Sequence, residues 1–145
     1  MSVLERFKTL PTVNDVTAAG TIPADAAAFA RDTITLGWED RLRTRGRRTT
    51  DGGIEFGIAL PRGTVLRQGD CLIVTPLRLI VTVVELAEPV LVVCPRTPED
   101  WGLVGYYIGN SHQPVMLTAE GLVCPDILGV RMILEQHRLA FIEDV

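Results

Sequence analysis

Histidine and cysteine are scarce in this sequence of 145 residues. It contains two histidines, His112 and His137, and three cysteines, Cys71, Cys94 and Cys124. The cysteines are odd in number, lie far apart and include no CxxC pair, so a disulfide framework is not expected. Free cysteines of this kind are commonly small, buried apolar side chains. Any transition-metal site would therefore depend on one or both histidines.

Signatures of catalysis are missing as well. No glycine-rich phosphate loop is present, because neither Gly63 nor Gly69 is followed by Gly-Lys-Ser or Gly-Lys-Thr. The GxSxG motif of serine hydrolases does not occur. A Cys–His nucleophile pair formed in three dimensions stays open, but no motif favours one. We therefore expect a protein that is not an enzyme.

The sequence also lacks long apolar runs and an excess of positive charge. Its longest apolar stretches, such as residues 79–84, have the length of strands and are too short to span a bilayer. Residues 1–10 are charged and carry no apolar core of a secretory signal. The net charge of -4 gives no broad reason to bind nucleic acid or an anionic membrane. We expect a soluble cytoplasmic protein that binds neither nucleic acid nor a membrane.

What is present is ample apolar material, 47% of residues, patterned first as strands. Ile54, Phe56, Ile58 and Leu60 share one face, which is the two-residue period of a half-buried strand. Further strand patterns lie at 33–38, 71–74 and 81–86. Turn residues separate them at 51–53, 61–63 and 68–70. The sequence predicts a small all-β domain over residues 1–87, of which residues 1–31 are the least readable.

From residue 88 the pattern changes to mixed strands and helices. An apolar run at 90–94 precedes a helix start at Thr97, whose side chain can cap the free amides before Pro98. Gly109-Asn110 stops this helix, 119–121 reads as a hairpin turn, Pro125-Asp126 opens a second helix, and 139–142 suits a last strand. The resulting β-α-β-β-α-β order predicts a ferredoxin-like domain over residues 88–145. The fold class is then α+β, with one face of the sheet free for a partner.

His112 is the first candidate ligand. It follows the helix stop and precedes Pro114, so we expect it in an exposed, rigid loop. A lone loop histidine is usually just solvated. One imidazole also cannot hold a transition metal tightly, because such ions take four to six ligands. A metal site therefore requires a second His112, which a twofold dimer brings to its axis.

Two further features carry open alternatives. His137 ends the second helix, where the helix dipole favours a cation, and it is a candidate secondary ligand. The run Arg41–Arg48 is rich in arginine and suits phosphates, a polar strand face or a charge-protected edge. No aromatic residue interleaves with these arginines, so we favour an acidic protein partner over nucleic acid.

Several segments, in this order and spacing, resemble the UreE family of urease accessory metallochaperones. They are Trp38–Arg45, Gly57–Leu66, Gln68–Asp70, Glu88–Val92, Tyr106–Pro114 and Asp126–Leu128. Residues 109–114 have the form Gly-Asn-x-His-x-Pro that is usual in the metal loop of this family.

The resemblance implies a metallochaperone that delivers Ni²⁺ for urease active-site assembly. It implies an N-terminal β-domain for protein contacts and a C-terminal ferredoxin-like domain that dimerises through its sheet. His112 of each subunit would then bind Ni²⁺ at the interface of a homodimer, a site that Zn²⁺ or Cu²⁺ could also occupy. The implied partners are the urease apoprotein and accessory proteins including the GTPase UreG.

Two departures from the family leave an alternative open. No histidine follows His137, whereas the family often has a histidine-bearing tail, and Tyr107 stands where the family often has histidine. The alternative is a UreE-like interaction scaffold that carries little or no metal. An RNA-binding ferredoxin-like sheet is disfavoured, because the strands at 90–93 and 115–117 lack the aromatic residues that stack on bases.

Overall fold

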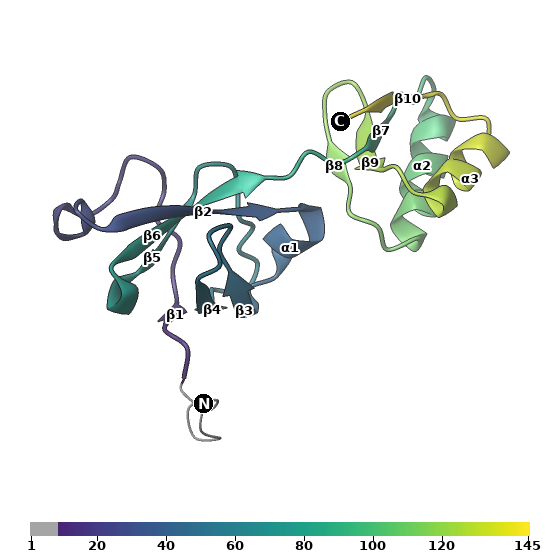
Figure 1. Ribbon diagram of the computed structural model, residues 1–145. Coiled ribbons are helices and arrows are strands. Elements are labelled where there is room, and N and C mark those ends of the chain that lie inside the picture. Colours follow the sequence, from purple (N-terminus) through teal and green to yellow (C-terminus); the bar gives the residue numbers. More distant parts are fainter. Residues whose placement is uncertain (1–8) are drawn as a thin grey trace. The chain divides into compact units, whose positions relative to one another are not determined.

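The computed structural model describes residues 9–145 (Figure 1). The predicted absence of a secretory signal concerns mainly residues 1–8, which lie outside the described residues. The chain divides into two compact units, Met1–Leu86 and Ala87–Val145. Helices and several sheets are both present, so the fold class is α+β. Within residues 9–145, no helix combines the length and the apolar character that crossing a membrane requires.

The first unit contains two three-stranded sheets. One has the order β1-β4-β3, formed by β1 (Thr12–Val13), β4 (Glu55–Ala59) and β3 (Arg45–Thr49). The other has the order β2-β6-β5, formed by β2 (Ala30–Leu36), β6 (Leu79–Glu85) and β5 (Cys71–Val74). β3–β4 and β5–β6 pair antiparallel, while β1–β4 and β2–β6 pair parallel.

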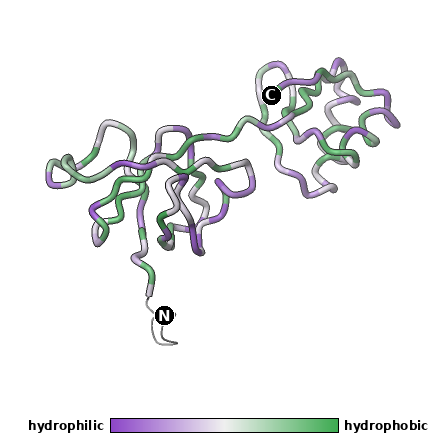
Figure 2. The backbone as a smooth tube through the Cα atoms, viewed as in Figure 1, coloured by the Kyte–Doolittle hydropathy of each residue, from purple (hydrophilic) through white to green (hydrophobic). Residues whose placement is uncertain are grey.

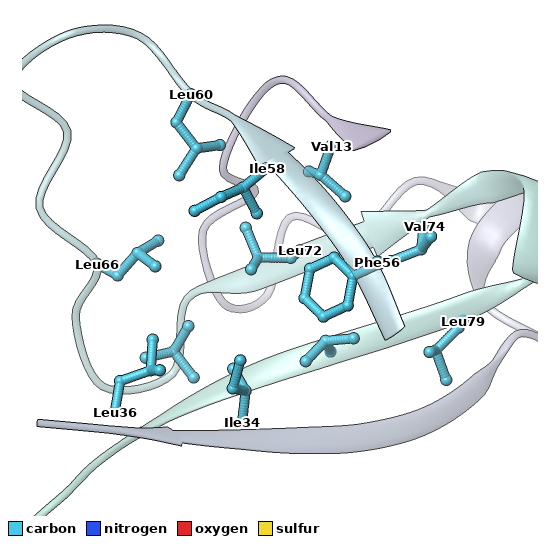
Figure 3. Close-up of a cluster of buried hydrophobic side chains, with 12 residues drawn as sticks. Val13, Ile34, Leu36, Phe56, Ile58, Leu60, Leu66, Leu72, Val74 and Leu79 are labelled. Carbon is cyan, nitrogen blue, oxygen red and sulfur yellow. The ribbon is translucent and has the colours of Figure 1, made fainter. Parts of the chain in front are cut away.

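A shared apolar core lies between these strands (Figure 3). The predicted alternation is confirmed for Phe56, Ile58 and Leu60, which are at most 3% exposed. Ile54 is 38% exposed, because it belongs to the turn that precedes β4. Burying one such side chain contributes about 1.5–3 kcal/mol, so β4 is a main support of this unit.

The all-β prediction for the first unit is wrong at one place. Trp38, expected at the end of a strand, instead begins the short helix α1 (Trp38–Leu42). Glu39 and Asp40 lie in its first turn, where the helix dipole favours negative charge. Two short 3₁₀ turns, η2 (Ala24–Ala26) and η3 (Thr75–Leu77), add further non-strand structure.

The second unit is a four-stranded antiparallel sheet with two helices. Its elements follow in the order β7 (Val90–Val93), α2 (Pro98–Asn110), β8 (Met116–Leu117), β9 (Leu122–Pro125), α3 (Leu128–Gln136) and β10 (Phe141–Asp144). The strand order in the sheet is β10-β7-β9-β8. The core joins one sheet face to the two helices and consists of Leu91, Val93, Val104, Ile108, Leu122, Cys124, Val130, Leu134 and Leu139.

The helix starts show one correct and one wrong prediction. The α2 cap is confirmed, since Thr97 Oγ1 accepts a hydrogen bond from the Asp100 amide at 3.1 Å. α3 begins at Leu128 rather than at Pro125-Asp126, because Pro125 is part of β9 and pairs with Val90. Ile127 is the N-cap of this helix and is 40% exposed.

Candidate metal centre

His112 lies in the turn that follows α2. Ser111 caps the helix, with its hydroxyl donating to the Ile108 carbonyl at 2.6 Å. The His112 amide donates to the Gly109 carbonyl at 3.2 Å. The left-handed residue that ends the helix is His112 itself, with φ of 53°, rather than Gly109 or Asn110 as the sequence suggested. Histidine is one of the non-glycine residues enriched in this conformation.

The backbone of this turn therefore presents the His112 side chain to solvent. His112 is exposed, as expected from its place between a helix stop and Pro114. In the described part of the chain, no side chain donates to, accepts from or ion-pairs with its imidazole. The ring is free to bind an incoming group. Figure 1 shows the loop that carries it running from α2 to β8.

Residues 9–145 of one chain do not supply a complete metal site around His112. Among residues 9–145, no group of three or more His, Cys, Asp or Glu side chains is placed to hold a metal ion. An imidazole suits Ni²⁺, Cu²⁺ and Zn²⁺, but these ions need several ligands. The donor chemistry of His112 therefore fits nickel, provided that ligands come from a second copy or a partner.

His137 has a different environment. It is the C-cap of α3 and lies half-buried. Its ring stacks on Tyr107 of α2, with centroids 4.0 Å apart and planes 24° from parallel. Tyr107 also meets Tyr106 edge to face, with centroids 5.1 Å apart. The ring of His137 thus links the end of α3 to α2. Its role as a secondary metal ligand stays a prediction.

This stack was missed by sequence reasoning. Tyr107 and His137 are far apart in the chain and lie on different helices, so no local pattern connects them. The available signal was the resemblance, which marked Tyr107 as a position where the family often has histidine.

The sheet face opposite the helices carries apolar side chains that are partly exposed in the second unit. The strand register aligns Ile142 with Val92, Val92 with Val123, and Val123 with Met116, which makes one row across the sheet. Ile142 is 60% and Met116 is 47% exposed. Val90, on the same face, lies in the next row. A row of this kind suits burial against another protein surface.

Cys124 does not offer a soft ligand near neutral pH. Cys71 and Cys124 are buried and Cys94 is half-buried, and all three are free thiols. Burial, with a smaller effect of the Asp126 charge, raises the pKa of the Cys124 thiol to about 11. Because a thiolate is the metal-binding form, Cys124 is a poor ligand at neutral pH.

The arginine run divides into inward and outward side chains. Arg48 is 9% exposed, and its guanidinium donates to the carbonyls of Asp40 at 2.7 Å and Arg43 at 3.2 Å. Arg41 forms an ion pair with Glu85 at 3.0 Å. Arg43, Arg45 and Arg47 are exposed. β3 is an outer strand that carries exposed arginines, and the role of the arginine run stays a prediction. Arg48 holds the corner between α1 and β3, whereas Arg41 ties α1 to β6.

Comparison with known proteins places these observations in a family context. Residues 13–85 match the family described as UreE urease accessory protein, N-terminal domain. The urease accessory protein UreE of Nostoc punctiforme is 32% identical over 123 residues, which cover 85% of this chain and 83% of that relative.

Other relatives carry the same name. UreE of Verminephrobacter eiseniae is 37% identical over 110 residues, covering 72% of this chain and 65% of that protein. UreE of Paraburkholderia xenovorans is 40% identical over 90 residues, covering 62% of this chain. The chain spans only 40% of the length of that last relative.

Proposed function

This chain belongs to the UreE family of urease accessory proteins, and from that premise we propose that it is a nickel metallochaperone. It binds Ni²⁺ at a homodimer interface and delivers the ion for urease active-site assembly in the cytoplasm. Nickel is its cargo, and the protein itself is not an enzyme. The relatives are named as accessory proteins, which supports this role.

The observation that carries the proposal is the state of His112. Its imidazole is exposed, free of partners among the described residues, and set on a turn fixed by helix-capping hydrogen bonds. With no three-ligand group in one described chain, nickel would bind between two copies of His112. A site shared across an interface, with few protein ligands, suits an ion that must be handed on.

Two structural features support the dimer and the domain type. The apolar row Ile142–Val92–Val123–Met116 offers a face for a second copy. The order of elements in the second unit, with strand order β10-β7-β9-β8, supports assigning it to the ferredoxin-like arrangement. The first unit is proposed to contact the urease apoprotein and accessory proteins including the GTPase UreG.

One observation favours a second function, a UreE-like scaffold that carries little or no metal. Among residues 9–145, no three His, Cys, Asp or Glu side chains are grouped so that they could hold a metal ion. In addition, His137 packs against Tyr107. On this alternative, contacts made by the first unit matter and His112 does not.

Equilibrium dialysis against Ni²⁺ separates the two functions. Wild type, His112→Ala and the matched control His137→Ala are compared at equal protein concentration. The metallochaperone predicts that His112→Ala loses nearly all bound nickel, whereas His137→Ala keeps most of it. Equal nickel binding by wild type and His112→Ala would sink the metal proposal and leave the scaffold.

A further inference from the structure

β3 is the outer strand of its sheet and leaves one edge open. In the order β1-β4-β3, no strand within residues 9–145 pairs with the far side of β3 (Figure 1). The Thr50 amide donates to the Ile54 carbonyl and the Leu60 amide donates to Thr44. Because antiparallel partners alternate, the even-numbered residues of this segment face β4.

The odd-numbered residues therefore direct their backbone groups to the open edge. These are Arg45, Arg47 and Thr49, each with an N–H and a C=O on the side away from β4. Their side chains lie on the sheet face away from the core, since the intervening Arg48 pairs with buried Phe56. The open edge thus combines unpaired strand groups with arginine side chains.

These arginines keep their charge available. No carboxylate in the described part of the chain ion-pairs with Arg45, and that of Glu55 lies 3.6 Å from Arg47 with both side chains more than half exposed. An exposed pair of this kind contributes little and yields to a competing carboxylate. In Figure 2 the tube along β3 has the colour of hydrophilic residues, in contrast to the hydrophobic strands of the core.

Charge on an edge strand commonly serves to block self-association. On β3 the positive charge also selects which strands can pair with this edge. Two β3 edges repel each other because both are positive, whereas a strand with carboxylates is attracted. Gly46, between the two arginines, has φ of 131° and open space where a Cβ would stand, so no side chain obstructs the strand at that point. Glycine within a strand often marks the close approach of another backbone.

We propose that the β3 edge binds an extended acidic segment of a partner protein as an added strand. The backbone groups of Arg45, Arg47 and Thr49 form the ladder. Carboxylates at alternate positions of the segment meet the guanidinium groups of Arg45 and Arg47, as cross-strand pairs on one face do. Nucleic acid is the less suitable occupant, because β3 has no aromatic residue to stack on bases.

The inference concerns the first unit and does not depend on nickel. Its test uses the full chain and a fluorescent peptide in which glutamate alternates with threonine, followed by fluorescence anisotropy. The double variant Arg45→Gln/Arg47→Gln should bind roughly three- to tenfold more weakly than wild type, as expected for two exposed ion pairs. Added salt should weaken wild-type binding. The control Arg31→Gln/Arg96→Gln removes equal charge from exposed positions elsewhere and should bind like wild type.

Backbone pairing is tested with N-methylated peptides. Two peptides are compared, one methylated at the odd-numbered amides and the other at the even-numbered amides. One should lose binding and the other should keep it, because only alternate N–H groups of the added strand face β3. Equal effects of both methylation patterns, or equal binding of a lysine-for-glutamate peptide, would overturn the proposal. So would a single-stranded oligonucleotide that binds more tightly than the acidic peptide and is lost in the double variant. Nickel binding by the double variant separates this result from the metallochaperone proposal, since it should stay at the wild-type level.

Discussion

Single residues at the ends of helices have decisive roles in this protein. His112 follows α2 in a left-handed conformation, with φ of 53°. This candidate ligand therefore occupies a backbone conformation that is unfavourable for residues other than glycine. Arg48 is buried and supplies donors to the carbonyl groups at the end of α1. His112 is exposed for the ligand role proposed above, whereas Arg48 supports the local fold.

Replacing His112 with glycine should separate its effect on the free energy of unfolding from its effect on nickel binding. Glycine adopts a positive φ without the cost that a Cβ brings, so His112→Gly is expected to raise the free energy of unfolding by up to about 1 kcal/mol over His112→Ala. Both variants lose the imidazole and should lose nickel. Urea denaturation checks the stability order, and a glycine variant less stable than the alanine variant would show that the turn is not strained.

Arg48→Ala should destabilise the first unit. It removes the guanidinium donor from the carbonyls of Asp40 and Arg43 and leaves Asp40 with only the long bond from the Arg43 amide at 3.4 Å. Losing hydrogen bonds to a charged group costs about 1.5–3 kcal/mol. Arg45→Ala is the matched control, because this arginine is exposed and its loss should change stability by only about 0.5 kcal/mol. Chemical denaturation of both variants measures the difference. Equal losses would mean that the burial of Arg48 has no energetic role.

At the scale of elements, one turn and one close contact hold strands in place. The turn between β3 and β4 is tied to β2 through Asp51. Its carboxylate accepts hydrogen bonds from the hydroxyls of Thr33 at 2.6 Å and Thr35 at 2.9 Å. Gly121, before β9, lies against the backbone of Val93. The Asp51 contact joins the two sheets of the first unit. The Gly121 contact holds the turn before β9 against β7 in the second unit.

The Asp51 contact predicts a pH dependence. Hydrogen bonds from Thr33 and Thr35 hold the pKa of the Asp51 carboxyl below its ordinary value. A lowered folded-state pKa means stability that is present above the unfolded value and lost as pH falls through the folded value. Asp51→Asn should therefore lower Tm at neutral pH and reduce its decline in acid. Thermal unfolding across this pH range tests it, with Asp25→Asn, an exposed residue of η2, as control. Parallel Tm curves for wild type and Asp51→Asn would contradict the assignment.

Gly121→Ala should disturb the sheet of the second unit. An added Cβ would overlap the Val93 carbonyl, which is backbone and cannot move aside cheaply. Overpacking of this kind costs about 1–3 kcal/mol. Gly129→Ala, in the first turn of α3 with open space around it, should instead stabilise by roughly 0.5–1 kcal/mol. Thermal unfolding of the pair provides the measurement, and a harmless Gly121→Ala would show that the hairpin end adjusts freely.

The elements also show what local sequence can predict. The cap at Thr97 and the alternation of Phe56, Ile58 and Leu60 depend on near neighbours and were correctly predicted. The start of α3 was not, because Pro125 carries a helix-start signal but pairs with Val90 in the sheet. The stack of Tyr107 on His137 depends on how two helices pack, which no local pattern encodes.

At the scale of the whole molecule, the chain divides into two compact units with different surface features. The first presents a positively charged strand edge, and the second presents His112 and a partly exposed apolar sheet face. Neither the edge nor the histidine completes a site within the described chain. On the functions proposed above, both features act through association, with a second copy at His112 and with a partner at the β3 edge.

The central claim is that nickel binds between two His112 residues, and subunit mixing tests it most directly. Wild type and His112→Ala are mixed in varying ratios, allowed to exchange subunits, and assayed for bound Ni²⁺. If both imidazoles of a dimer are needed, bound nickel follows the square of the wild-type fraction and falls to about a quarter at equal mixing. If each chain binds nickel alone, it falls linearly to about a half, and that result would contradict the account.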